Sequence, residues 1–132
     1  MAGKTVVRTE EAPAPFQGAP YSQAIKAGGF VFVSGQLGLA PGSSEMVGST
    51  IQEQTEQIFD NLAAILAEAG SGLDRIVKTT VFLMSLDDFQ GMNEVYARRM
   101  GDSPPARSTV EVGALPSGAL VEIEAIAEAS PS

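Results

Sequence analysis

Arg107 has the side-chain type and the position to bind a small organic anion. It follows the loop segment Pro104-Pro105-Ala106 and begins a run of alternating residues that is typical of a strand. Strand ends that border loops are common positions for functional side chains. A guanidinium there can bind a carboxylate through two parallel hydrogen bonds. The alternative is a surface arginine paired with a glutamate.

Glu122 is the candidate for handling water. Alternation in the segment 121–127 puts Glu122 and Glu124 on one face and apolar residues on the other. If this strand pairs with the strand that begins at Arg107, a glutamate lies near the guanidinium and can orient or deprotonate water. An exposed glutamate, with a pKa of about 4.3, is a weak base unless burial raises that pKa. The alternative is a solvated strand face.

Four further residues are candidates for contacts with a ligand. Tyr21 can offer a phenol hydrogen bond, and Ser34 and Gly35 follow a strand where a glycine lets a ligand approach the backbone closely. Asn93 lies at the edge of the apolar stripe of a helix and can point into a cleft. The alternatives are turn or packing roles for the first three residues and a solvent-facing side chain for Asn93.

The composition removes several kinds of chemistry. The chain has no cysteine and no histidine, so disulfides, thiolate nucleophiles, the usual general base and the commonest metal ligand are absent. No phosphate-binding glycine loop or metal-ligand spacing is present. We therefore expect neither a metal nor a cofactor. Any catalysis uses Glu, Asp, Arg, Tyr, Ser, Thr, Asn, backbone groups and water.

Charge and hydropathy limit the partners. The 132 residues include 16 acidic and 8 basic ones, for a net charge of -8, which argues against nucleic acid because phosphate binding needs clustered cations. No apolar run approaches the length of a membrane span, and the N-terminus lacks a signal core. We expect a soluble, cytoplasmic protein of one domain, 1–132, with a strand and tail at 1–12 and a tail at 128–132.

The elements that must position these residues follow a β-β-β-α-β-α-β-β order, which predicts an α+β fold with two helices covering one face of a mixed sheet. Gly28-Gly29 favours a tight hairpin turn, and Thr50 with Glu53 forms a capping box. We expect Ser85 with Asp88 to cap the second helix. Its apolar stripe is Phe89, Met92, Tyr96 and Met100. Strands are expected at 5–9, 22–26, 30–34, 75–84, 107–112 and 120–127, and helices at 50–69 and 87–100.

Several segments together resemble one known family. They are Ala19-Pro20-Tyr21-Ser22-Gln23-Ala24, Val33-Ser34-Gly35-Gln36, Ile76-Val77-Lys78-Thr79-Thr80-Val81, Asn93-Glu94-Val95-Tyr96, Pro105-Ala106-Arg107-Ser108-Thr109-Val110 and Val121-Glu122-Ile123-Glu124-Ala125. Over about residues 12–127 the sequence closely resembles the reactive-intermediate deaminase family, also called the Rid or YjgF-type family. The C-terminal Pro-Ala-Arg-Ser segment is the most specific of these marks.

The resemblance implies both a fold and an activity. The implied fold is the chorismate-mutase-like α+β type, assembled as a homotrimer with a central barrel and with clefts between neighbouring subunits. The implied activity is cofactor-free hydrolysis of 2-aminoacrylate (as 2-iminopropanoate) and 2-iminobutanoate to 2-keto acids and ammonia. The implied partners are a small 2-imino or 2-keto carboxylic acid and copies of the same chain.

The resemblance also implies roles for particular residues. Arg107 matches the arginine that binds the substrate carboxylate, and Glu122 matches the glutamate that positions or activates water. Many relatives carry cysteine where this chain has Thr109, so thiol chemistry is absent here. The backbone N–H of Thr109 is expected to help bind substrate. Other cleft positions are matched by Tyr21, Ser34, Gly35 and Asn93.

Two other functions stay open at this point. Some relatives are described as ribonucleases or translation inhibitors, although the acidic charge and the missing histidine count against RNA cleavage. The third reading is a non-catalytic trimeric binding module for small carboxylates or for a partner protein. The same arginine serves that role, so the sequence separates it poorly from catalysis.

Overall fold

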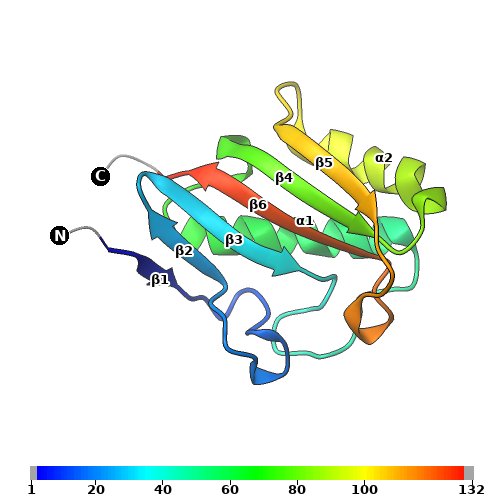
Figure 1. Cartoon of the computed structure of the whole chain (residues 1–132), viewed down its shortest axis with the longest axis horizontal. Coiled ribbons are helices and arrows are strands. Elements are labelled where there is room, and N and C mark those ends of the chain that lie inside the picture. The colour runs from blue at the N-terminus through cyan, green and yellow to red at the C-terminus, as the bar shows by residue number, and fades with distance from the viewer. Residues whose placement is uncertain (1–2, 130–132) are drawn as a thin grey trace.

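A computed structural model describes residues 3–129, which form six strands and two helices in the expected β-β-β-α-β-α-β-β order (Figure 1). Each strand and helix lies within a few residues of its predicted position, and the predicted order of the elements is confirmed. The bounds are β1 Thr5–Val7, β2 Ala24–Ala27, β3 Phe30–Gln36, α1 Ile51–Glu68, β4 Ile76–Leu83, α2 Phe89–Met100, β5 Ala106–Glu111 and β6 Val121–Glu128.

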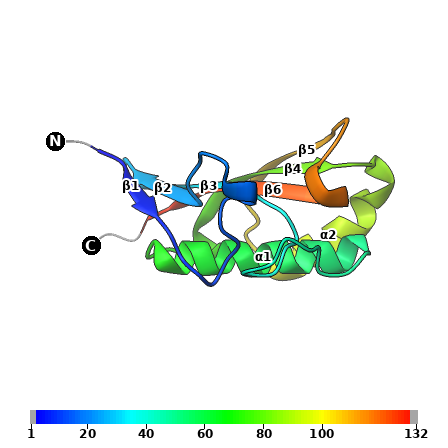
Figure 2. The ribbon, with the colours of Figure 1, turned by 90° about the horizontal axis from the view of Figure 1, so that it is seen from below.

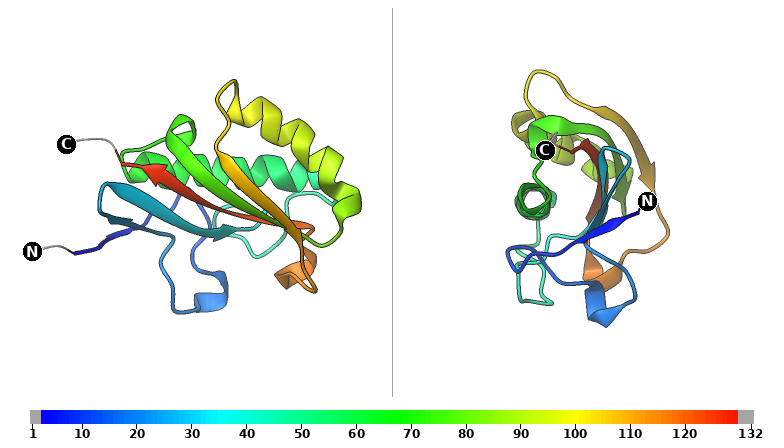
Figure 3. Two further views of the ribbon diagram at one scale, coloured as in Figure 1. Left: turned by 45° about the horizontal axis from the view of Figure 1, so that its top comes forward. Right: turned by 90° about the vertical axis from the view of Figure 1, so that its left-hand side faces the viewer.

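The strands form one mixed sheet with the order β1-β2-β3-β6-β4-β5. All neighbours are antiparallel except β4 and β5, which are parallel and are joined through α2. Both α-helices lie on one face of the sheet, and no α-helix within residues 3–129 covers the other face (Figures 2 and 3). The expected two-layer α+β architecture is therefore confirmed.

The longer helix begins and packs as its sequence predicts. The Thr50 side chain accepts the N–H of Glu53, and the Glu53 side chain accepts the N–H of Thr50, which completes the capping box. The apolar stripe of α1 forms the centre of the core between helix and sheet. Its fully buried members are Ile58, Phe59, Leu62, Ile65 and Leu66.

The start of the second helix differs from expectation. A 3-10 turn, Leu86–Asp88, precedes α2, and the Ser85 hydroxyl accepts the N–H of Asp87 within that turn. Asp88, at the N-cap of α2, makes no capping bond through its side chain. Ser85 therefore caps the turn that leads into α2, as expected, but the contribution predicted for Asp88 was wrong. Phe89 is 37% exposed instead of lying in the core, and its ring lies near Arg107 on β5.

The ends of several strands also differ from the predicted bounds. β2 starts at Ala24, two residues later than expected, and β3 continues to Gln36 across an irregularity in its pairing with β6. β6 runs through Glu128, one residue into the segment expected as a tail. Residues 130–132 of that expected tail, and residues 1–2 of the expected N-terminal tail, lie outside the described residues.

The face of the sheet away from the helices carries exposed apolar side chains. In β3, Val31 and Val33 are buried toward the helices, whereas Phe30 and Phe32 are 39% and 45% exposed on the opposite face. Val110 in β5 is 43% exposed on that same face. No helix within residues 3–129 has the length and hydropathy to cross a membrane.

Candidate functional site

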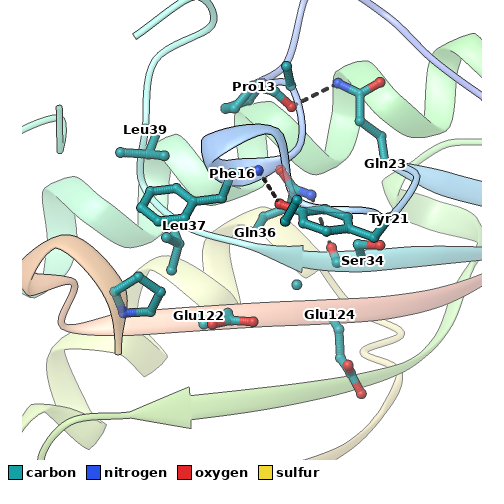
Figure 4. A pocket seen from close by; sticks show the side chains of 14 residues that line it. Pro13, Phe16, Tyr21, Gln23, Ser34, Gln36, Leu37, Leu39, Glu122 and Glu124 are labelled. Carbon is teal, nitrogen blue, oxygen red and sulfur yellow. Dashed lines mark hydrogen bonds between the residues drawn. The ribbon is translucent and has the colours of Figure 1, made fainter. Parts of the chain in front are cut away.

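A pocket of about 450 Å³ opens where the end of β3 meets β6 and two loops (Figure 4). Its volume is within the range of small-molecule sites. One wall is apolar and the floor carries polar and acidic groups. The lining residues are Pro13, Ala14, Phe16, Ala19, Tyr21, Gln23, Ser34, Gly35, Gln36, Leu37, Leu39, Pro116, Glu122 and Glu124.

Glu122 reaches the floor of this pocket by lying directly against Gly35. A Cβ atom at Gly35 would overlap Oε2 of Glu122 and would lie 2.9 Å from its Cδ. A glycine is therefore required where β3 passes the carboxylate. Burial, and then the negative charge of Glu124, raises the pKa of Glu122 above its ordinary value. A raised pKa makes this carboxylate a stronger base than an exposed glutamate.

Tyr21 and Ser34 are held beside the carboxylate by hydrogen bonds to the backbone. The Phe16 N–H donates to the Tyr21 phenol oxygen at 2.6 Å, which leaves the phenol hydrogen free to donate to a ligand. The Ser34 hydroxyl donates to the Ser22 carbonyl at 2.6 Å, so its oxygen can still accept. Both residues line the pocket as expected.

The amide of Gln23 fixes the loop that forms one side of the pocket. Its oxygen accepts the Thr9 N–H at 2.7 Å, and its nitrogen donates to the Pro13 carbonyl at 2.8 Å. The Gln23 residue is 3% exposed, and both the oxygen and the nitrogen of its amide form hydrogen bonds with the loop. Gln23, which lies just before β2 and itself lines the pocket, therefore fixes the wall formed by Pro13 and Ala14.

Two loops reach the pocket through left-handed turns. Gln17 and Ser117 have φ angles of 54° and 55°, which non-glycine residues rarely adopt, and each precedes a glycine. These turns place Phe16 and Pro116 in the pocket wall. Strained backbone of this kind persists where the surroundings enforce it and is common at functional sites.

Arg107 lies in a different place, on the face of β5 that is turned toward α2. Its Nη1 donates to Oδ1 of Asn93 at 2.8 Å. Its Cζ is 4.6 Å from the ring centroid of Tyr96 and 5.5 Å from that of Phe89. Asn93 therefore contacts the arginine instead of pointing into solvent, and the guanidinium has a defined orientation.

Thr109 lies on the same side of β5 as Arg107, two residues further along. Its hydroxyl oxygen is buried and has no hydrogen-bond partner within the described residues. β5 is an edge strand, and the Val112 N–H donates to the Leu83 carbonyl at 2.9 Å. Because successive N–H groups alternate in direction along a strand, the Thr109 N–H faces the open edge, where edge strands have free donors.

The predicted residues form two groups, not one. β4 lies between β5 and β6, and its residue Thr79 pairs with Arg107 whereas its residue Phe82 pairs with Glu122. Two strand spacings and three residues along the strands separate Arg107 and Glu122 by about 14 Å. The two side chains also face opposite sides of the sheet. The two strands do not pair, so the condition under which a glutamate would lie near the guanidinium is not met within one copy of the chain. One group is the pocket with Tyr21, Ser34, Gly35 and Glu122, and the other is the cluster of Asn93, Arg107 and Thr109.

The aromatic rings around Arg107 were missed by sequence reasoning. Phe89, Asn93 and Tyr96 are spaced i, i+4 and i+7, so they share one face of α2. That spacing, with the Asn93 amide between two aromatic residues on one helix face, could have indicated that Phe89 and Tyr96 surround a cation. Within residues 3–129, no group of three or more acidic side chains is arranged to hold a metal ion.

Comparison with known proteins identifies the family. Residues 9–129 match the family described as Endoribonuclease L-PSP. The chain belongs to this family. A RutC family protein of Pyrococcus abyssi is 52% identical over 94% of this chain and 96% of its own length. The chloroplastic Reactive Intermediate Deaminase A of Arabidopsis thaliana is 48% identical over 94% of this chain and 65% of its own length.

The L-PSP family also accounts for the fold. The crystal structure of E. coli TdcF with bound serine matches with a TM-score of 0.88 and 36% identity, over 96% of this chain and 99% of that chain. The family resemblance seen in the sequence motifs, and the α+β fold that it implied, are therefore confirmed.

Proposed function

We propose that this protein hydrolyses small 2-imino acids, such as 2-iminopropanoate and 2-iminobutanoate, to 2-keto acids and ammonia. The observation that carries the proposal is Glu122, a half-buried carboxylate of raised pKa seated on Gly35 in a pocket large enough for such substrates. The 48% identity to a protein named Reactive Intermediate Deaminase A supports this activity over others in the family.

In this proposal the site is shared between two copies of the chain. The pocket is lined by two carboxylates and by no basic side chain, so within the described residues one copy alone offers no cation there for a substrate carboxylate. Arg107 is oriented but lies on the opposite face of its own sheet. We propose a homotrimer in which Arg107 of one copy lies beside the Glu122 pocket of the next. The exposed Phe30 and Phe32 favour burial of the open sheet face in that assembly.

The proposed reaction needs little beyond orientation. Arg107 binds the substrate carboxylate through paired hydrogen bonds, and the backbone N–H of Thr109 adds a donor at the edge of the sheet. Glu122 accepts a proton from water as the water oxygen attacks the carbon of the protonated C=N bond. Glu122 then returns that proton to the amine nitrogen of the carbinolamine, and the C–N bond breaks to release ammonia. The hydroxyl proton passes to the Glu122 carboxylate and from there to the ammonia, which leaves the keto acid, an ammonium ion and an ionised Glu122. Holding water and substrate in line supplies the acceleration.

Smaller contributions come from the other pocket residues. Tyr21 has a phenol hydrogen to donate, because the Phe16 N–H already donates to its oxygen. Gly35 admits the carboxylate of Glu122, and Ser34 accepts from the ligand or from water. The bound serine named for the E. coli TdcF structure supports a site for a small amino-acid-like molecule in this chain as well.

A coupled assay tests the proposal. Threonine dehydratase or an amino-acid oxidase generates the imine, and semicarbazide traps whatever imine survives, so a deaminase lowers the trapped fraction. Arg107→Ala and Arg107→Lys are expected to lose the activity while they keep the fold, because an ammonium is a point charge without the paired geometry of a guanidinium. Near-normal turnover by either variant contradicts the assignment. Binding of 2-oxobutanoate without imine hydrolysis by the native protein would support the binding-module alternative instead, and RNA cleavage by it would support the ribonuclease one.

A further inference from the structure

The guanidinium of Arg107 is held by three residues of α2. The face of the Tyr96 ring lies 4.6 Å from Cζ, the Phe89 ring lies 5.5 Å from it, and Asn93 accepts a hydrogen bond at 2.8 Å. A cation within about 6 Å of an aromatic centroid is attracted to the ring. These contacts restrict a side chain that otherwise has many rotamers.

The Tyr96 ring is itself fixed from the sheet. Its hydroxyl is hydrogen bonded to the Thr79 hydroxyl at 2.6 Å, and its ring meets Phe59 edge-on with centroids 5.6 Å apart. Tyr96 is 5% exposed and Thr79 is fully buried. Thr79 is also the residue of β4 that pairs with Arg107 in the sheet register. Thr79 therefore fixes two things: it pairs with the backbone of Arg107 in the sheet, and it holds the Tyr96 ring next to the Arg107 guanidinium.

This arrangement leaves the hydrogen-bonding edge of the guanidinium available. A guanidinium has five N–H donors, and within residues 3–129 only Nη1 is used, by Asn93. Contacts with a ring do not consume N–H groups. A carboxylate is bound best when two parallel N–H groups face it in one plane, so the orientation of that plane decides the affinity.

We propose that the Thr79–Tyr96 pair is a positioning unit that sets the plane of the Arg107 guanidinium for a substrate carboxylate. This inference rests on the proposed function, because it assumes that Arg107 binds the carboxylate. Tyr96 is a positioning residue and not a catalytic one, since its hydroxyl bonds Thr79 and its buried ring lies against Arg107 and Phe59.

The first test separates the hydrogen bond from the ring. Thr79→Val with Tyr96→Phe replaces both partners of the buried bond by apolar groups of similar shape, a change that is close to neutral for stability. In the same background, Tyr96 is replaced by trifluorophenylalanine, which keeps the ring shape and removes its attraction for a cation. We expect the dissociation constant of 2-oxobutanoate to rise about threefold in the first variant and about tenfold in the second.

Two further readouts distinguish positioning from a general packing effect. A weaker contact with the substrate carboxylate should raise KM by a larger factor than it lowers kcat, whereas a damaged core would lower the folded fraction. The order parameter of the Arg107 Nε–H, measured by NMR, should fall in both variants, because the side chain is less restricted. Thermal unfolding of each variant establishes that it is folded.

A second arginine–ring pair, between Arg99 of α2 and Phe59 of α1, provides the control. The Cζ of Arg99 lies 5.7 Å from the centroid of the Phe59 ring, and Arg99 bonds Glu56 and Asp60 on α1. Arg99→Lys weakens a similar contact at a residue that does not line the pocket, and it leaves the Tyr96 ring and the Thr79–Tyr96 hydrogen bond in place. It should leave the dissociation constant of 2-oxobutanoate unchanged.

Each outcome decides the proposal. It is overturned if folded variants bind 2-oxobutanoate like the native protein and keep the Arg107 order parameter, while Arg107→Ala abolishes binding. In that case the role of Arg107 survives and the positioning role does not. If the fluorinated variant fails to fold, the same criteria apply to the Thr79→Val, Tyr96→Phe variant alone. If Arg107→Ala itself keeps normal binding and turnover, the proposed function fails first, and the positioning role fails with it.

Discussion

Gly35 and Glu122 face each other so closely that the Glu122 carboxylate fills the space a side chain at position 35 would need. The contact joins β3 and β6 at the floor of the pocket. Gly35 does not have the positive φ angle that excludes other residues. Its replacement is therefore opposed by the carboxylate and not by backbone strain.

We expect Gly35→Ala to lower imine turnover about a hundredfold, because the added methyl pushes the carboxylate out of its position and an error of about 1 Å has that effect. The affinity for 2-oxobutanoate should change little, since Arg107 is untouched. The matched control is Gly113→Ala, because a Cβ at that glycine meets no atom within 4 Å. Normal turnover by Gly35→Ala would show that the position of the carboxylate is irrelevant to the reaction.

The acid limb of the pH–rate profile should belong to Glu122. Burial and the charge of Glu124 raise the pKa of Glu122, and the proposed base works only when ionised, so turnover rises with pH through that raised value. Glu124→Gln removes the charge that helps to raise this pKa, and the acid limb should move to lower pH. Initial rates across pH 4–8, with the dehydratase in excess, measure the shift. An acid limb that persists unchanged in Glu122→Gln would assign the titration to another group.

The sequence was sufficient for the elements because their signals are local. The capping box at Thr50 and Glu53, and the positive φ angles at Gly28 and Gly29, involve residues within one turn of each other. Period-two alternation also placed Arg107 and Thr109 on one face of β5, as observed. Local patterns of this kind do not depend on which elements pack together.

The sequence was insufficient for the relation between Arg107 and Glu122, because strand order is set by long-range packing. Alternation tells which residues share a face but not which strand is the neighbour. One clue was present, since the strand–helix–strand run from β4 through α2 to β5 favours parallel neighbours. That rule places β4 beside β5. The contact of Phe89 with Arg107 depends on the same packing.

The buried amide of Asn61 should hold the apolar wall of the pocket. Its nitrogen donates to the Leu37 and Leu39 carbonyls at 3.1 and 2.9 Å, and its oxygen accepts from Gln57. Asn61→Asp keeps the shape of the side chain but replaces the amide NH2, which donates two hydrogen bonds, by a carboxylate oxygen. That oxygen can only accept, and it faces the Leu37 and Leu39 carbonyls. We expect the free energy of unfolding to fall by about 2–3 kcal/mol at neutral pH, as measured by urea denaturation.

The neighbouring residue provides the control for that substitution. Asp60→Asn is the reverse change on an exposed part of the same helix, where the side chain is 61% exposed and pairs with Arg99. A surface pair of this kind contributes little, so the expected change is within about 0.5 kcal/mol. Equal effects of the two substitutions would mean that the Asn61 amide does not hold the loop.

Mixing two inactive variants tests whether the site is shared between copies. Arg107→Ala keeps a native Glu122 pocket, and Glu122→Gln keeps a native arginine. In a ring of identical interfaces, a complete site forms wherever the arginine of a Glu122→Gln copy meets the pocket of an Arg107→Ala copy. Refolding the two together in equal amounts should therefore restore activity at about one site in four.

The control for this experiment is a mixture in which no complete site can form. Arg107→Ala refolded with the Arg107→Ala, Glu122→Gln double variant contains no arginine at position 107 and should stay inactive. Different affinity tags on the two chains show that mixed assemblies are present. If such assemblies exist and the first mixture remains as inactive as its components, the two residues do not act together across an interface. The separation of Arg107 and Glu122 on opposite faces of one sheet would then have to be explained by a site that uses only one of them.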